Sequence, residues 1–176
     1  MGNLPSMLRI LWKHLPKLLN SLMDLISKTQ SSTPVSPQSI PEKPSQSFHF
    51  KASVDGKTAT GILSFGTKTW PAVSGPWRKG YLPAGEYEAY GFWDTDGAAY
   101  SYVDKATGEI TGFYVRLEPK FKTERDQLLI HFDGNVEGSL GCIAIKCDNR
   151  LKALDTYFDL KKIMQVGKVP LTVSLV

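Results

Sequence analysis

A proline-rich stretch divides the chain into two unequal parts. Residues 29–47 contain four prolines among serines, threonines and glutamines. Such a composition cannot bury a core, so we expect an extended or disordered linker there. The sequence after the linker, 48–176, is long enough for one domain of ordinary size. The linker therefore predicts a domain boundary near Phe48.

Residues 1–28 are predicted to form a basic amphipathic helix. Apolar residues recur there at three- and four-residue intervals, and Pro16 is expected to kink or split the helix. Four basic residues against Asp24 give this segment three of the four net positive charges of the chain. Two roles stay open. The helix can pack on the domain or on a partner, or it can bind a membrane surface through its basic face and the interfacial Trp12.

The bulk composition excludes several classes of protein. Because the rest of the chain is nearly neutral, the basic stripe typical of a nucleic-acid-binding domain is not expected, and we predict no nucleic-acid partner. Basic residues interrupt the apolar run near the N-terminus, and no small-residue cleavage site follows, so we expect no cleavable signal peptide. Two cysteines make no disulfide scaffold. No His/Cys spacing resembles a zinc site, and we predict no metal and no cofactor.

Short alternating runs between turn residues predict that 48–176 is mainly β. The 41% apolar content, 15 glycines and 11 prolines of the chain suit a soluble domain of this kind. Asp55-Gly56 predicts a hairpin turn. One helix is expected at about 148–158, with Asp148 as its N-cap. The candidate strands are 48–54, 59–65, 86–92, 111–117, 127–132, 142–146 and 169–175.

One segment carries a pattern typical of nucleophilic catalysis. An apolar strand ends at His131, a glycine-rich loop follows over 133–141, and a second apolar strand begins at Cys142. If the two strands lie side by side, the imidazole reaches the thiol. A free thiol has a pKa of about 8.5, so a neighbouring imidazole that takes its proton creates the reactive thiolate. We therefore predict Cys142 as nucleophile and His131 as base.

The loop before the cysteine supports this interpretation. Amide groups around Gly141 and Cys142 are placed to form an oxyanion hole, and Ser139 belongs to the same stretch. The alternative is a strand histidine beside a buried, inert cysteine. Two glycines in Gly138–Cys142 cost backbone entropy if they only join two strands, which favours the catalytic interpretation. Cys147 would face the opposite side of a continuous strand, so we interpret it as structural.

These residues resemble the signature of the L,D-transpeptidase (YkuD-like) catalytic domain. The resemblance lies in His131-x-x-Gly134 followed by Ser139-Leu140-Gly141-Cys142-Ile143. Upstream, Ser74-Gly75-Pro76 and Leu82-Pro83-Ala84-Gly85-Glu86-Tyr87 resemble the family's stretch before the site. Thr123-Glu124-Arg125 resembles an element of the short branches found in phage and in secreted antibacterial effectors. The resemblance covers about 48–176.

The resemblance implies a β-sandwich-like fold with one or two short helices, and peptidoglycan stem peptides as partner and substrate. In that family the cysteine forms a thioester at the L-centre of the stem's diamino acid. An amine acceptor then gives a cross-link, and water gives carboxypeptidase or endopeptidase activity. The chain departs from the family at Leu140, where a histidine is usual, and at Ala144, where an arginine is usual. Arg125 is a candidate to replace that charge and hold a substrate carboxylate.

The leading hypothesis is a hydrolytic relative that cuts stem peptides in the periplasm or cell wall, delivered there by phage lysis or by secretion. Gly134 and Trp77 are further substrate-binding candidates, although aromatic residues in small β domains more often belong to the core. One rival is a true transpeptidase that cross-links or modifies the wall. Another is a non-catalytic peptidoglycan-binding module with a membrane-active helix.

Overall fold

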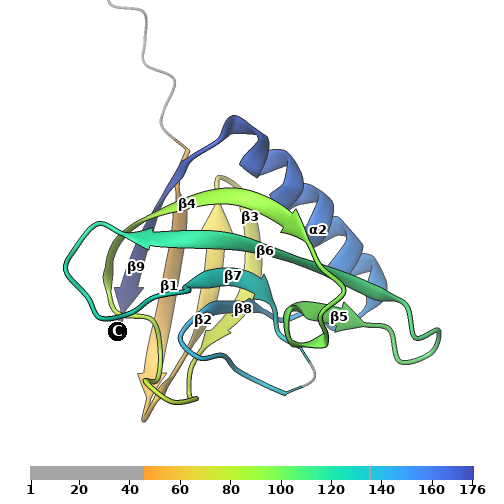
Figure 1. Ribbon diagram of the computed structural model, residues 1–176, viewed down its shortest axis with the longest axis horizontal. Coiled ribbons are helices and arrows are strands. Elements are labelled where there is room, and N and C mark those ends of the chain that lie inside the picture. Colours follow the sequence, from red (N-terminus) through yellow and green to blue (C-terminus); the bar gives the residue numbers. More distant parts are fainter. Residues whose placement is uncertain (1–45, 135) are drawn as a thin grey trace, which may run out of the picture. The chain divides into compact units, whose positions relative to one another are not determined.

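The computed structural model describes residues 46–134 and 136–176. The predicted helix over 1–28, and all but the last two residues of the predicted linker over 29–47, therefore lie outside the described residues. The described part of the chain belongs to one compact unit. Figure 1 shows its strands curving around a common interior, with a single long helix along one side.

Strands dominate the described residues, as the sequence predicted. They join in the order β4-β9-β1-β2-β3-β8-β7-β6-β5, and a further pairing of β4 with β6 closes eight of them into a barrel. The pairs β1–β9 and β7–β8 are parallel, and the other pairs are antiparallel. The strands are β1 Phe48–Asp55, β2 Thr58–Phe65, β3 Lys68–Ser74, β4 Gly85–Asp94, β5 Ser101–Val103, β6 Ile110–Pro119, β7 Leu129–Phe132, β8 Ile143–Ile145 and β9 Val169–Leu175.

The closed sheet differs from the sandwich that the family resemblance implied. A sandwich consists of two sheets that each keep unpaired edges, whereas pairing β4 with β6 removes those edges. Strand β4 bends where its register to β6 shifts between Tyr90 and Trp93. Gly91 lies in this bulge with φ +68°, a left-handed conformation that suits glycine. Strand β4 pairs with β9 over Gly85–Ala89 and with β6 from Tyr87 to Asp94, so it lies between these two strands.

Two tight hairpins begin the barrel. Asp55 pairs with Thr58 around Gly56, which confirms the predicted turn. Phe65 pairs with Lys68 around Gly66 in the same way. Both glycines have positive φ, +55° and +58°, as two-residue hairpin loops require. The strand after Gly66, β3, was not predicted, because it contains Pro71 and a proline lacks the N–H group that a sheet normally uses.

Alternation of apolar and polar residues fills the barrel. In β1, Phe48, Phe50 and Ala52 are buried, and the residues between them are exposed. Strand β6 alternates similarly from Tyr114 to Glu118. In β7 and β8 successive side chains also point alternately into the core and to the outer face, but 130–132 and 143–145 are all buried. That outer face of β6, β7 and β8 carries the site.

Helix α2 spans Arg150–Ile163 and is longer than the predicted 148–158. Its N-cap is Asn149, whose side chain accepts from the Lys152 amide, and not Asp148 as predicted. Asp148 instead forms an ion pair with the Lys152 ammonium group.

Two short 3-10 helices, η1 Ala98–Tyr100 and η2 Met164–Val166, complete the elements. Within 46–134 and 136–176, no helix combines the length and apolar character that crossing a membrane requires.

Candidate active site

Strand register brings His131 and Cys142 to the same face. Strands β7 and β8 are parallel neighbours, with Ile130 opposite Ile143 and His131 opposite Ala144. Both isoleucines are fully buried in the core. Residues alternate between faces, so His131 and Cys142 lie together on the outer face, two positions apart on adjacent strands. The prediction that the two strands lie side by side is confirmed.

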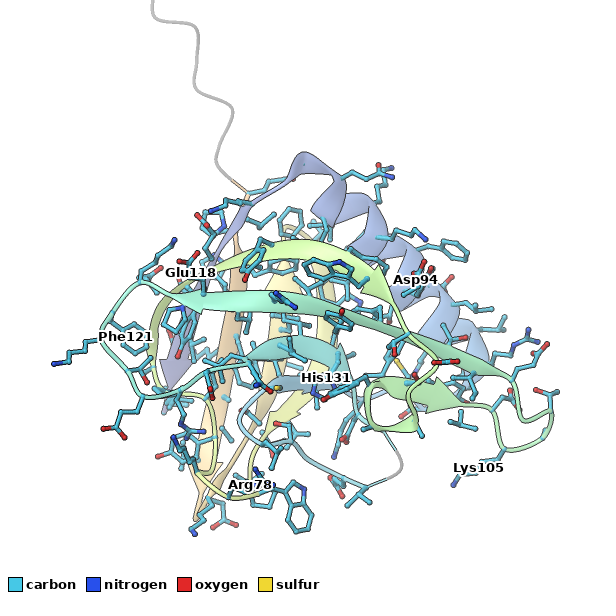
Figure 2. All side chains as sticks on the ribbon, viewed as in Figure 1. Arg78, Asp94, Lys105, Glu118, Phe121 and His131 are labelled. Atoms are coloured by element: carbon cyan, nitrogen blue, oxygen red, sulfur yellow. The ribbon has the colours of Figure 1, made fainter. Side chains whose placement is uncertain are left out.

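The two side chains line one groove of about 680 Å³. Trp77, Arg78 and Leu140 are among its other walls, and Tyr100 borders it from η1. Figure 2 shows His131 on β7, with Arg78 in the loop that follows β3 on the same side of the barrel. Trp77 is 46% exposed, and its indole N–H donates to the Glu137 carbonyl at 3.1 Å. Its predicted place in a substrate groove is compatible with this position.

His131 is held in one tautomer. Its Nδ1 lies 2.6 Å from the Phe132 carbonyl oxygen, which only accepts, so the proton resides on Nδ1. Nε2 is therefore the nitrogen that can take a proton. The ring of Tyr100 covers the imidazole edge to face, with centroids 5.0 Å apart. Burial lowers the pKa of His131 from 6.5 to about 4, although the bond to Phe132 partly offsets this, so the imidazole is a neutral base near pH 7.

Cys142 is a buried thiol rather than a preformed thiolate. Its Sγ donates to the Gln127 carbonyl at 3.7 Å, and the side chain is 7% exposed. Burial raises the pKa of Cys142 from 9.0 to about 11, while the Leu129 amide and the charge of Arg125 act in the opposite direction. The sequence predicted a thiolate formed by proton transfer to the imidazole. The two environments favour the neutral thiol and the neutral imidazole in this structure.

Ser139 organises the loop before the nucleophile. Its buried hydroxyl donates to the Cys142 carbonyl at 2.7 Å and accepts from the amides of Gly141 at 3.2 Å and Gly75 at 3.3 Å. The Ser139 amide donates back to the Gly75 carbonyl at 2.6 Å. The Gly141 amide, predicted as an oxyanion donor, is thus directed at Ser139. Of the two predicted donors, this leaves the amide of Cys142 for that role.

Gly134 packs under η1 and does not line the groove. A Cβ built on it would lie 2.5 Å from the Ala98 carbonyl oxygen. The missing side chain lets η1 sit directly on the loop after β7, and η1 carries Tyr100 against the His131 ring. Gly134 therefore helps to position Tyr100 against His131 in this structure, whereas the sequence predicted contact with substrate.

Arg125 joins the two loops that flank the cysteine. Its Nη2 donates to the carbonyls of Lys79 at 2.5 Å and Tyr81 at 2.8 Å. Its Nη1 lies 3.4 Å from the carbonyls of Gly80 and Leu140. A Cβ on Gly141 would come within 2.5 Å of Nη1, so the glycine makes room for the guanidinium. These backbone carbonyls occupy the guanidinium N–H groups of Arg125, which the sequence analysis proposed for binding a substrate carboxylate.

The motif stretches upstream brace the same loop. The Ser74 hydroxyl accepts from the Leu82 amide at 2.8 Å, and the Tyr87 hydroxyl donates to the Pro83 carbonyl at 2.8 Å. These bonds fix the segment that carries Trp77 and Arg78. Leu140 is 53% exposed in the groove, whereas Ala144 is fully buried and does not reach it.

Sequence reasoning missed Tyr100, Gln127 and Arg116. Tyr100 and Gln127 line the groove from outside the motifs, and Arg116 lies one strand away from β7. The alternation of β6 places Tyr114 and Arg116 on the outer face, but only strand pairing shows that this face adjoins Cys142.

Cys147 is a free thiol 3.8 Å from the Thr156 hydroxyl and outside the groove. Within 46–134 and 136–176, no three His, Cys, Asp or Glu side chains are grouped to hold a metal ion.

The fold and the site together define a mixed β-barrel with a thiol and an imidazole on one face, an arrangement able to perform acyl transfer. No protein-family model matches the chain, and the curated proteins compared with it gave no match. Among solved structures, the chain is similar to the crystal structure of Mycobacterium tuberculosis L,D-transpeptidase 1, with a TM-score of 0.35 and 20% identity. The alignment covers 74% of this chain and 63% of that one, so the chain spans less than two thirds of that protein's length.

Proposed function

We propose that the protein is a cysteine-dependent peptidase that cleaves peptidoglycan stem peptides through a thioester. The observation that supports this most is the presence of His131 and Cys142 on one outer face, in a groove large enough for a peptide. The motif resemblance around these residues supplies the substrate class. The proposed setting is the periplasm or cell wall, reached by phage lysis or by secretion as an antibacterial effector.

The chemistry uses the neutral pair as it stands. As Sγ of Cys142 attacks the carbonyl at the L-centre of the diamino acid, Nε2 of His131 takes the thiol proton. The oxyanion accepts a hydrogen bond from the Cys142 amide. The C–N bond then breaks, the imidazolium returns the proton to the departing amine, and a thioester remains. Water, deprotonated by His131, attacks that thioester and releases the shortened stem and the thiol.

Hydrolysis is proposed over cross-linking because of the groove wall beside the cysteine. An acceptor amine competes with water only if it is held near the acyl carbon. Leu140 is the residue that occupies the position of the family's second histidine, and its exposed side chain offers no polar group. Glu137 forms an ion pair with Lys146, which occupies another polar group of the loop.

The test is digestion of tetrapeptide and cross-linked muropeptides, with and without a D-amino acid acceptor, followed by identification of products by mass. Shortened stems should accumulate, and Cys142→Ala should release none. The matched control is Cys147→Ala, a thiol outside the groove, which should act like the wild type. Predominant exchange of the acceptor into the stem would restore the transpeptidase hypothesis. Binding without any product would favour the non-catalytic module.

A further inference from the structure

A row of outward-facing positions leads from the nucleophile across the sheet. Because Ile130 is opposite Ile143, Leu129 is the neighbour of Cys142. Leu129 pairs in turn with Arg116 of β6, and Arg116 pairs with Tyr90 of β4. All four positions are on the outer face, since each is followed or preceded by a residue that is buried in the core, namely Ile143, Ile130, Val115 and Ala89. Arg116 is therefore two strands from Cys142.

A second pocket of about 520 Å³ lies along this row. It is lined by three tyrosines, an arginine, a glutamine and three leucines, namely Tyr90, Tyr100, Tyr114, Arg116, Gln127, Leu117, Leu128 and Leu129. Tyr100 and Gln127 also line the groove of the nucleophile, so the two hollows adjoin. The Gln127 backbone carbonyl accepts the hydrogen bond of the Cys142 thiol. The second pocket thus begins beside the reacting atoms.

Arg116 has open hydrogen-bond donors. Within 46–134 and 136–176, no carboxylate lies within 4.0 Å of its guanidinium and no hydrogen bond from it is present, and the same is true of Arg78 in the first groove. Its guanidinium lies 5.2 Å from the centre of the Trp93 ring, which orients it. By contrast, Arg125 donates to backbone carbonyls, and Arg150 pairs with Glu109 at 2.5 Å. An oriented guanidinium with open donors, in a pocket that three tyrosines also line, matches the chemistry of a carboxylate.

We propose that this pocket is a subsite for a carboxylate of the substrate, held by Arg116 within about two residues of the scissile carbonyl. The proposal rests on the proposed function, because it takes Cys142 as the point of attack. Two strand spacings amount to about 10 Å between backbones. One extended residue spans at most about 3.6 Å, and the arginine side chain covers most of the remainder.

A stem tetrapeptide carries three free carboxylates, and the proposal concerns the two on the residues joined by the scissile bond. One is the terminal carboxylate of the residue that leaves, and the other is on the side chain of the diamino acid. The third, the α-carboxylate of the γ-linked D-Glu, lies one residue further from that bond. The test measures binding of three forms of L-Ala-γ-D-Glu-diaminopimelyl-D-Ala to full-length Cys142→Ala protein by calorimetry. One form is unmodified, one is amidated at the terminus, and one is amidated on the diaminopimelyl side chain. One of the two amides should bind about tenfold or more weakly, because a charge-assisted hydrogen bond is lost.

Variants at Arg116 separate the subsite from general charge. In the Cys142→Ala background, Arg116→Gln should bind all three peptides equally weakly, and Arg116→Lys should keep part of the discrimination. The matched control is Arg150→Gln, which removes an exposed arginine on α2 and should leave discrimination intact. Thermal unfolding confirms that each variant is folded. Equal binding of the three peptides, or discrimination that survives Arg116→Gln, would overturn the proposal.

Cleavage is measured separately with protein that retains Cys142. Failure of the carboxylate subsite can then be distinguished from failure of the proposed peptidase activity. Carboxylate-dependent binding without cleavage by the wild type supports the subsite and removes the proposed peptidase activity. Cleavage of all three peptides at equal rates, with no effect of Arg116→Gln, overturns the subsite and leaves the peptidase activity.

Discussion

Burial sets the protonation states of the two reacting side chains. His131 is 3% exposed and Cys142 is 7% exposed, and each is held in its uncharged form. The sequence could place the two residues near each other, because a strand ending in histidine and another beginning at cysteine are local patterns. It could not predict this burial, because the covering ring of Tyr100 comes from a segment far from both motifs.

The lowered pKa of His131 makes the free energy of unfolding depend on pH. Between pH 6.5 and about 4 the unfolded chain binds a proton that the folded chain excludes, so the free energy of unfolding falls as the pH falls. A shift of this size corresponds to about 3 kcal/mol. In His131→Asn this contribution should vanish, while His49→Asn, an exposed imidazole on β1, should keep it. Urea unfolding at pH 7, 5.5 and 4 measures the difference. An identical loss of stability in wild type and His131→Asn would contradict the assignment.

The thiol of Cys142 should react with iodoacetamide slowly near pH 7. Its pKa of about 11 means that the thiolate fraction grows about tenfold with each pH unit below that value. The measurement is the alkylation rate from pH 7 to 10 in Cys147→Ala protein, which has a single thiol in the described domain. A steady rise is expected. A plateau reached by pH 8 would indicate a preformed thiolate and contradict the neutral pair.

At the scale of elements, strand pairing explains what periodicity could not. Alternation predicted β1, β2, β4, β6, β7, β8 and β9 close to their observed bounds. The sequence missed β3 because of Pro71, and it missed the short β5. The N-cap of α2 lies one residue later than predicted, because Asn149 and not Asp148 accepts the free amide of Lys152. Asp and Asn are both favoured at the N-cap, so their residue types do not decide which of the two adjacent positions caps the helix. The backbone conformation at that point decides it.

Arg125 is expected to stabilise the loops between the strands. Its guanidinium joins the Lys79–Tyr81 backbone to the loop before Cys142. Arg125→Ala should lower stability by about 2 kcal/mol, since charged hydrogen bonds are lost and carbonyls lose their donor. It should also slow turnover, because the loop that carries the nucleophile is released. Thermal unfolding and product formation measure the two effects.

The matched control for that variant is Arg150→Ala. This arginine forms one exposed ion pair with Glu109, so its removal should change stability little. Arg125→Lys should restore only part of the stability, because an ammonium group cannot reach four carbonyls at once. Full stability and full turnover in Arg125→Ala would contradict the role of a loop clamp.

At the scale of the whole molecule, barrel closure depends on strands distant in sequence. β1 pairs with β9, and β3 pairs with β8, across most of the domain. No local pattern predicts such pairings, which is why the sequence supported a mainly β domain but not a closed barrel. The row from Cys142 to Arg116 depends on the pairing of β6, β7 and β8. The sequence alone could not predict it, because no local pattern specifies these pairings.

The described unit should function without the N-terminal segment. The barrel circuit and the groove use residues from Phe48 onward. A chain that begins at Ser47 should therefore fold cooperatively and cleave soluble muropeptides at a rate close to that of the full chain. Circular dichroism and product formation test this. Aggregation or loss of activity would mean that the predicted helix over 1–28 belongs to the core of the domain.

If the proposed mechanism holds, Cys142 carries the acyl group during turnover. Intact-protein mass spectrometry, after mixing with the stem tetrapeptide and quenching in acid, measures this intermediate. We expect an adduct with the mass of the acyl portion, mapped by peptide analysis to Cys142. The adduct should persist in Cys147→Ala and disappear in Cys142→Ala. An adduct on Cys147, or product formation at the wild-type rate by Cys142→Ala, would rule out Cys142 as the nucleophile.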